Sequence, residues 1–165
     1  GRENGVGASD YLARAIGYNL THQLSHNTKK PDGWEQFSNY CNFLMEEYGR
    51  FLQRLQDTPE PTGNGTMLDN TLTLFGSTSS AFHLSRNYPI VLTGGSNLGF
   101  KHGQYLKFGT DEDNSSTSGI SSDKGWRSNV KDEERPLSDL YLTMLHRLGV
   151  EADSFGGSDT TVSEA

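Results

Sequence analysis

The stretch "YPIVLTGG" (Tyr88–Gly95) decides the expected fold, because it is almost wholly apolar from Pro89 to Leu92. A strand with one face in water alternates apolar and polar side chains, whereas this run is continuous. Continuous hydrophobicity indicates burial on both faces, as in a parallel sheet that is covered by helices. The segment therefore predicts a buried strand inside a layered α/β domain.

Two other segments extend this predicted sheet. The run "LDNTLTLFG" is rich in β-prone residues and ends at Gly76, with its apolar side chains at Leu72, Leu74 and Phe75. The shorter run "GQYLKFG" (103–109) predicts a third strand near an edge of the sheet.

The clearest helix prediction covers residues 33–56. Apolar side chains recur at steps of three and four over about six helical turns, at Trp34, Phe37, Cys41, Leu44, Tyr48, Phe51 and Leu55. Asp32 and Glu35 have the spacing of a capping box at its start. A second apolar stripe follows Pro136, which suits a first helical residue, and runs to Leu148 before Gly149. Helix, strand, strand and helix in this order favour an α/β layer structure.

Composition excludes several classes of function. The chain has 165 residues, enough for one domain with its own core, and we treat 1–165 as a single domain. Its formal net charge of −7, without a basic stripe, argues against nucleic acid as a partner. No apolar stretch approaches the ~20 residues of a membrane span. Cys41 is the only cysteine, so an internal disulfide is excluded, and its apolar neighbours predict a buried thiol.

The two ends of the chain and one internal segment are polar, and we expect them to lie outside the predicted α/β core. Residues 109–125 contain Ile120 as their sole large apolar side chain, which predicts an exposed low-complexity insertion. The tail after Gly149 offers one apolar anchor, Phe155. The opening "GRENGVG" lacks a methionine, so we expect a processed or excised start and a longer parent protein.

The stretch "THQLSHN" (Thr21–Asn27) is the strongest chemical candidate. In a helix His22 and His26 would share one face, which suits two imidazoles on one metal ion. The metalloprotease motif requires glutamate after the first histidine, and Gln23 stands there instead. Solvated or hydrogen-bonded histidines are the ordinary alternative. Ser25 beside His26 is a weaker candidate, because catalytic triads are assembled in space rather than along the chain.

Two loops after predicted strands are further candidates. "GGSNLG" (Gly94–Gly99) follows a strand as a phosphate loop would, but no helix start follows it, which favours a plain tight turn. "GSTSSAFH" (Gly76–His83) also follows a strand, where open α/β sheets bind ligands. Its residues are mostly hydroxyls, so a flexible loop is the alternative.

Several segments together carry a resemblance to a known family. They occur in the order "GREN", "IGYNLTHQLSHN", "MLDNTLTLFGS", a histidine, "YPIVLTGG", "HGQYL" and "LYLTMLHRLGV…SFGG". In this order, from Gly1 to about Gly157, the chain resembles the HXXSHH family of uncharacterised, usually exported bacterial proteins. The family motif maps onto His22–Asn27, where Asn27 replaces the final histidine.

The same layout is similar, more distantly, to the C-terminal part of sulfatases and alkaline phosphatases. In that superfamily an Asp-Asn-Thr strand leads to metal-binding Asp and His residues, and this chain keeps Asp69, Asn70 and Thr71. After the strand it has no Asp-His pair, so His83 is the ligand candidate left there. The resemblance implies a partial alkaline-phosphatase-like sheet with packed helices and long loops. It also implies that His22, His26 and His83 bind a divalent metal (zinc, iron or manganese) or an oxyanion. Ser25 would be a polar neighbour of that site.

Two hypotheses for function follow from the resemblance. The first is a C-terminal portion of an HXXSHH-type protein that acts as a non-catalytic structural or assembly subunit of the cell envelope. The alternative is a metal-dependent hydrolase of phosphate or sulfate esters with a partial or degenerate site. Asn27, the missing Asp-His pair and the missing N-terminal half favour the first. We expect a periplasmic, cell-envelope or extracellular location, and identical copies or a cleaved N-terminal half as the partner covering residues 33–56 or 88–93.

Overall fold

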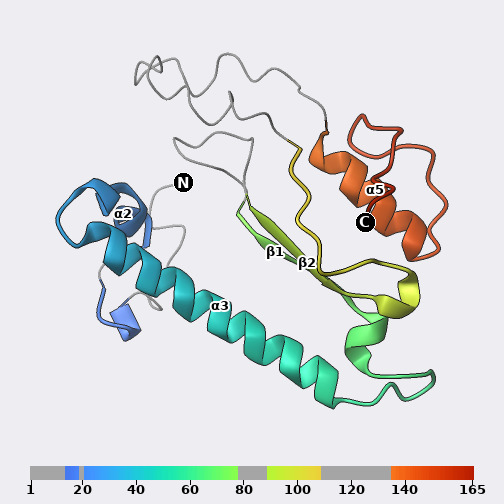
Figure 1. Ribbon diagram of the computed structural model, residues 1–165, viewed down its shortest axis with the longest axis horizontal. Coiled ribbons are helices and arrows are strands. Elements are labelled where there is room, and N and C mark those ends of the chain that lie inside the picture. Colours follow the sequence, from blue (N-terminus) through green and yellow to red (C-terminus); the bar gives the residue numbers. More distant parts are fainter. Residues whose placement is uncertain (1–13, 19–20, 78–88, 109–134) are drawn as a thin grey trace. The chain divides into compact units, whose positions relative to one another are not determined.

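The computed structural model describes residues 14–18, 21–77, 89–108 and 135–165 (Figure 1). The chain divides into two compact units, Gly1–Arg54 and Leu55–Ala165. The predicted insertion at 109–125 and the predicted ligand His83 lie outside the described residues. Helices together with a small sheet make the fold mixed α/β, as the sequence predicts at that level.

The first unit contains α2 (Thr21–His26), the 3₁₀ turn η2 (Asn27–Lys29) and most of the long helix α3 (Gly33–Asp57). The predicted helix 33–56 is thereby confirmed. The core of this unit contains two buried residues, Leu24 of α2 and Tyr40 of α3. Partly buried neighbours pack against them: Ile16, Tyr18, Phe37 and Leu44. This small core explains why the short helix α2 forms against the start of α3, since short helices depend on tertiary packing.

The junction before α3 differs from the predicted capping box. Asp32 has φ of 60°, a left-handed conformation, whereas a capping residue at a helix start is normally extended. Its carbonyl accepts the first helical bond, from the Gln36 N–H at 3.0 Å. Gly33 is buried, and a Cβ there would collide with the Asn27 carbonyl oxygen. The close approach of η2 to the helix start therefore requires glycine.

The second unit holds the sheet, which consists of β1 (Leu72–Gly76) and β2 (Ile90–Gly94). Both strands are confirmed, but the predicted parallel arrangement is wrong, because the two strands pair antiparallel with Leu74 opposite Leu92. The residues of β2 are partly buried or exposed, so its continuous apolar run did not signal burial on both faces. A cross-strand pair also ties the strands, with the hydroxyl oxygens of Thr73 and Thr93 2.6 Å apart.

The predicted third strand is also wrong. Residues 103–108 form no strand, and the side chain of Tyr105 is 87% exposed. Extended backbone alone does not make a strand, because a strand needs a neighbour for its N–H and C=O groups. The preceding residue Phe100, in contrast, is buried. The chain therefore leaves the sheet after Gly94, the last residue of β2, and residues 103–108 do not rejoin it.

Helix α5 (Leu137–Arg147) confirms the predicted C-terminal helix, with Pro136 as its N-terminal cap rather than its first helical residue. The second core lies beside it. Phe100, Val162 and Ala165 are buried there, and partly buried side chains pack around them: Leu72, Leu92, Leu98, Leu140 and Met144. Phe155, the predicted anchor of the tail, is 44% exposed and makes an edge contact with Tyr141. The tail is anchored instead by Val162 and Ala165.

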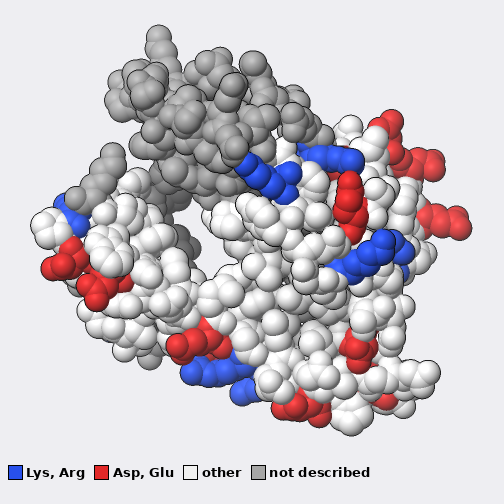
Figure 2. Space-filling view, viewed as in Figure 1, with Lys and Arg blue, Asp and Glu red and all other residues white. Residues whose placement is uncertain are grey.

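Surface charge on the described residues is mixed. Figure 2 shows lysines and arginines on the visible face as separate small groups with acidic residues between them. No helix among the described residues has the length and hydrophobicity needed to cross a bilayer.

Candidate functional site

The "THQLSHN" motif folds as α2 followed by the first residue of η2. His22 and His26 are four residues apart in one helix, so their backbone positions lie on the same helical face, as predicted. Leu24 lies about 160° around the helix from both positions and is buried in the first core. The motif face therefore lies opposite the packed face. His26 and Ser25 are exposed.

Only part of the predicted set of metal ligands lies among the residues that the structure describes. His83 lies outside the described residues, so its approach to His22 and His26 stays a prediction. Across the described ranges, no three histidine, cysteine, aspartate or glutamate residues gather into a group that could hold a metal ion. Two imidazoles alone do not complete a zinc site, which takes three or four protein ligands. The described donors therefore fit a complete metal centre poorly, and no chemical step is derived through one.

Cys41 lies in an environment that disfavours a reactive thiolate. Its side chain is partly buried on α3, and this burial raises the pKa of the thiol. A raised pKa leaves less reactive thiolate at neutral pH. The predicted role as a small apolar residue agrees with this environment.

Asp69 is the centre of a polar network in the second unit. It lies in the 3₁₀ turn η3 (Met67–Asn70) directly before β1. Its Oδ2 accepts hydrogen bonds from the Thr66 N–H at 2.7 Å and from the Thr66 hydroxyl at 2.8 Å. Its Oδ1 accepts a third bond, from the Ser96 hydroxyl at 2.6 Å. The bonds from Ser96 and then Thr66 lower the pKa of Asp69, because they stabilise the charged carboxylate.

Asn70 continues this network across the same turn. Its Oδ1 accepts from the Asn97 amide at 3.2 Å, and the same Asn97 amide donates to the Asn64 carbonyl at 3.0 Å. Its own amide lies 3.4 Å from Glu60 Oε2. These bonds join η3 to η5 (Ser96–Leu98), which is the middle of the "GGSNLG" stretch.

The "GGSNLG" stretch is a tight turn, in agreement with the plain interpretation of its sequence. Its glycines take left-handed conformations, with φ of 71° at Gly95 and 83° at Gly99. Gly94 also has positive φ, and a Cβ there would collide with the Thr71 carbonyl oxygen. The glycines therefore serve the close packing of two turns rather than a phosphate cradle.

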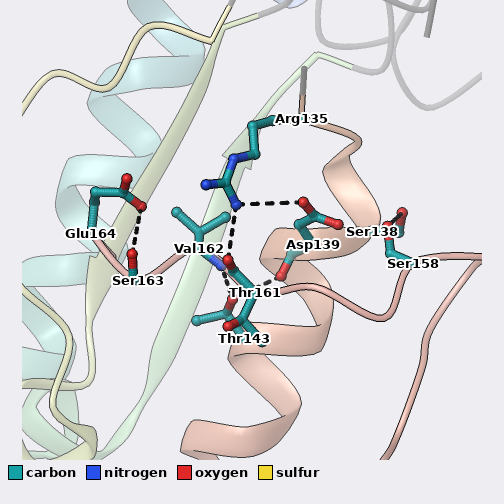
Figure 3. Close-up of polar contacts among 9 residues, drawn as sticks. All are labelled: Arg135, Ser138, Asp139, Thr143, Ser158, Thr161, Val162, Ser163 and Glu164. Atoms are coloured by element: carbon teal, nitrogen blue, oxygen red, sulfur yellow. Dashed lines mark hydrogen bonds and ion pairs between the residues drawn. The ribbon is translucent and has the colours of Figure 1, made fainter. Parts of the chain in front are cut away.

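The N-terminal turn of α5 forms a second polar cluster, shown in Figure 3. Asp139 is 1% exposed, and its Oδ2 lies 3.7 Å from Arg135 Nη1. The same Arg135 nitrogen donates to the Thr161 carbonyl at 2.9 Å. Thr143 donates its hydroxyl to the Asp139 carbonyl at 2.7 Å and accepts the Val162 N–H at 2.8 Å. The cluster thus fastens the last residues of the chain to α5.

One atom of this cluster lacks a partner. Asp139 Oδ1 is buried, and no hydrogen-bond donor among the described residues reaches it. Asp139 is the third helical residue, and the residue three before it is Pro136. In a capping box the carboxylate at this position accepts the N–H of the cap residue. Proline has no N–H, so the usual donor is missing here.

A shallow hollow lies next to this cluster. It has a volume of about 340 Å³ and is bounded by an exposed segment and two charged residues: Tyr105, Leu106, Lys107, Phe108, Arg135 and Glu164. Arg135 is already engaged with Thr161 and Asp139. The hollow therefore offers no free cation at that position.

Comparisons with protein-family models, curated proteins and solved structures found no match to this chain. The two polar clusters were missed by sequence reasoning. A signal existed for the first, since "TMLD" (Thr66–Asp69) has the capping-box spacing that was assigned to Asp32 and Glu35. The second depends on contacts between residues far apart in the chain, such as Thr143 and Val162.

Proposed function

We propose that this chain is the C-terminal portion of an exported HXXSHH-type protein and serves as a non-catalytic structural or assembly subunit of the cell envelope. A partial alkaline-phosphatase-like sheet with packed helices and long loops is the fold that belongs to this proposal. One observation carries it: the carboxylate of Asp69, the acid retained from the Asp-Asn-Thr strand, is used inside the protein.

The argument rests on what occupies the oxygens of Asp69. In a hydrolase of the alkaline phosphatase type, carboxylates near this strand would be directed at a metal ion. Here both oxygens accept hydrogen bonds from the chain's own donors, Thr66 and Ser96. The neighbouring Asn70 is bonded to Asn97 in the same way. These contacts hold two turns together, which is a structural use of the motif.

The assembly part of the proposal is supported by the apolar surface of α3. Trp34, Met45 and Phe51 are large apolar side chains that are exposed on this helix. A second copy of the chain, or a cleaved N-terminal half, would bury them. A specific interface of this kind covers at least about 1,000 Å² in total.

Light scattering on the purified chain tests the assembly. We expect a dimer or higher oligomer, and Phe51→Asp should shift it toward the monomer because the charge opposes burial of this side chain. Glu46→Gln, at an exposed polar position of the same helix, is the matched control and should leave the oligomer intact. A wild-type chain that stays monomeric at all concentrations would contradict the proposal.

The alternative is a metal-dependent hydrolase of phosphate or sulfate esters with a partial site. It is supported by the placement of His22 and His26 on one face of α2. Metal analysis of the dialysed protein separates the two functions. We expect no stoichiometric zinc, iron or manganese. One equivalent of metal that is lost in His22→Ala and His26→Ala, but kept in His146→Ala, would establish the alternative.

A further inference from the structure

The last eight residues, Ser158–Ala165, form a segment that we name the C-terminal strap. Val162 is 3% exposed, and with Ala165 it packs against Phe100 in the second core. Leu140 and Met144 of α5 line the same contact. The strap thus packs against apolar side chains of α5 and of the segment that contains Phe100.

Side chains of neighbouring elements, rather than a backbone ladder, hold the strap. Its main-chain groups bond to Thr143, Arg135 and Gln104, through Val162 N–H at 2.8 Å, Thr161 O at 2.9 Å and Glu164 O at 2.7 Å. Its backbone–backbone bonds within the described ranges are local, between Phe155 and Ser158 and between Val162 and Ala165. Release of the strap would therefore break these side-chain bonds and the apolar contacts, but no sheet.

Asp139 is linked to the strap through Arg135 and Thr143, and its side chain is in an unfavourable environment. Figure 3 shows Arg135 between Asp139 on α5 and the main chain of the strap at Thr161. The guanidinium is shared, at 2.9 Å from Thr161 O and 3.7 Å from Asp139 Oδ2. Asp139 Oδ1 meanwhile has no donor within the described chain, and Pro136 cannot supply one. A buried carboxylate oxygen without a donor opposes the state that buries it.

We propose that the strap is a detachable element whose closed state is opposed by Asp139. In the closed state Val162 and Ala165 pack against Phe100, Leu140 and Met144. In the open state Arg135 is released from Thr161 and can pair with a hydrated Asp139, and the apolar side chains of Phe100 and Met144 are exposed. Apolar burial favours closing, and the buried, unpartnered oxygen of Asp139 favours opening, so the closed state is less stable than apolar burial alone would make it.

Hydrogen exchange on the full chain tests this directly. The Val162 amide bonds to Thr143 of α5, so it exchanges only when the strap leaves. The amide of Leu142, which is buried in α5, reports unfolding of the helix itself. We expect the Val162 amide to exchange at least ~10-fold faster than the Leu142 amide, with weaker dependence on denaturant, as for a local opening.

Two substitutions separate a detachable strap from an ordinary packed terminus. Asp139→Leu removes the unpartnered carboxylate and should slow exchange at Val162, whereas Thr143→Val removes an attachment and should speed it. Asp139→Asn is the second variant if leucine does not fold, and it should also slow exchange. Asp153→Asn, at an exposed acid of the same unit, is the control and should change nothing. Equal exchange rates at Val162 and Leu142, or no slowing in either Asp139 variant, would overturn the proposal.

Discussion

Asp69 and Asp139 occupy the same position in two different helical turns, yet their carboxylates meet opposite conditions. Each is the third residue of its turn, with the cap residue three positions before it. Asp69 accepts the Thr66 N–H, whereas the equivalent residue before Asp139 is Pro136, which has no N–H. The comparison shows that the cap residue decides whether an acid in the first turn is a stabilising cap.

The two regions also differ in what surrounds the carboxylate. Asp69 is partly exposed and joins two hydrogen-bonded turns, η3 and η5. Asp139 is buried, as are Leu142 and Thr143 in the same helix, and Thr143 accepts the Val162 N–H of the C-terminal strap. Polar contacts therefore dominate the first region, and apolar burial dominates the second. Substitutions that remove the cap N–H from Asp69 or supply one to Asp139 should show how much each contributes to stability.

The largest effect on stability is expected from the apolar core around α5. Leu142→Ala removes a fully buried side chain of α5 and should reduce the free energy of unfolding by about 2–5 kcal/mol. Urea unfolding followed by circular dichroism measures it. Leu148→Ala, at an exposed leucine just after the same helix, should change stability by no more than ~0.5 kcal/mol. Similar losses in both variants would show that α5 is not part of a tightly packed core.

The next largest effect is expected when Asp69, like Asp139, has a proline as its cap residue. Thr66→Pro removes the N–H that Asp69 accepts, and φ of −110° at this residue does not suit proline. We expect a loss of more than about 1 kcal/mol in the same unfolding experiment. Thr66→Val keeps the N–H and removes only the hydroxyl, so its loss should be smaller. A neutral Thr66→Pro would show that this cap contributes little.

The reciprocal substitution supplies Asp139 with the cap N–H that Asp69 already has. Pro136→Ser introduces an N–H at the cap, where φ of −66° and ψ of 146° are acceptable for serine. Capping contributes ~1 kcal/mol, and the loss of proline rigidity offsets about half of it, so we expect a net gain of about 0.5 kcal/mol. Pro136→Ala supplies the N–H without a hydroxyl and should recover part of the gain. Destabilisation in both variants would contradict the role given to the missing N–H.

The smallest effect is the pH dependence of the Asp69 network. Hydrogen bonds from Ser96 and Thr66 lower the folded-state pKa of Asp69 below its unfolded value, which is about 3.9. A lowered pKa stabilises the folded protein above that pH, and the contribution disappears as the pH falls through the folded-state value. Asp69→Asn should therefore flatten the fall in melting temperature below pH ~4. Asp153→Asn should keep the wild-type slope, and an unchanged slope in Asp69→Asn would refute the assignment.

The elements that sequence reasoning predicted correctly depend on local patterns. The apolar stripe at every third or fourth residue predicted α3 and α5, because a helix of this kind needs only one apolar face. Runs of β-prone residues ended by glycine predicted β1 and β2. The spacing of His22 and His26 predicted a shared face only if the segment was helical, and α2 meets that condition. The part of the metal site that depends on His83 stays a prediction.

By itself, then, the sequence determined α3, α5, the two strands and the tight turn at Ser96, since these follow from interactions within a few residues. Only the tertiary structure decided that β1 and β2 run antiparallel and that residues 103–108 form no strand. It also decided that the strap packs on α5, through pairs as distant as Gln104 and Glu164, 60 residues apart. Such contacts leave no periodic pattern in the sequence. They depend on which surfaces meet once the elements have formed, and that is decided by packing rather than by local preference.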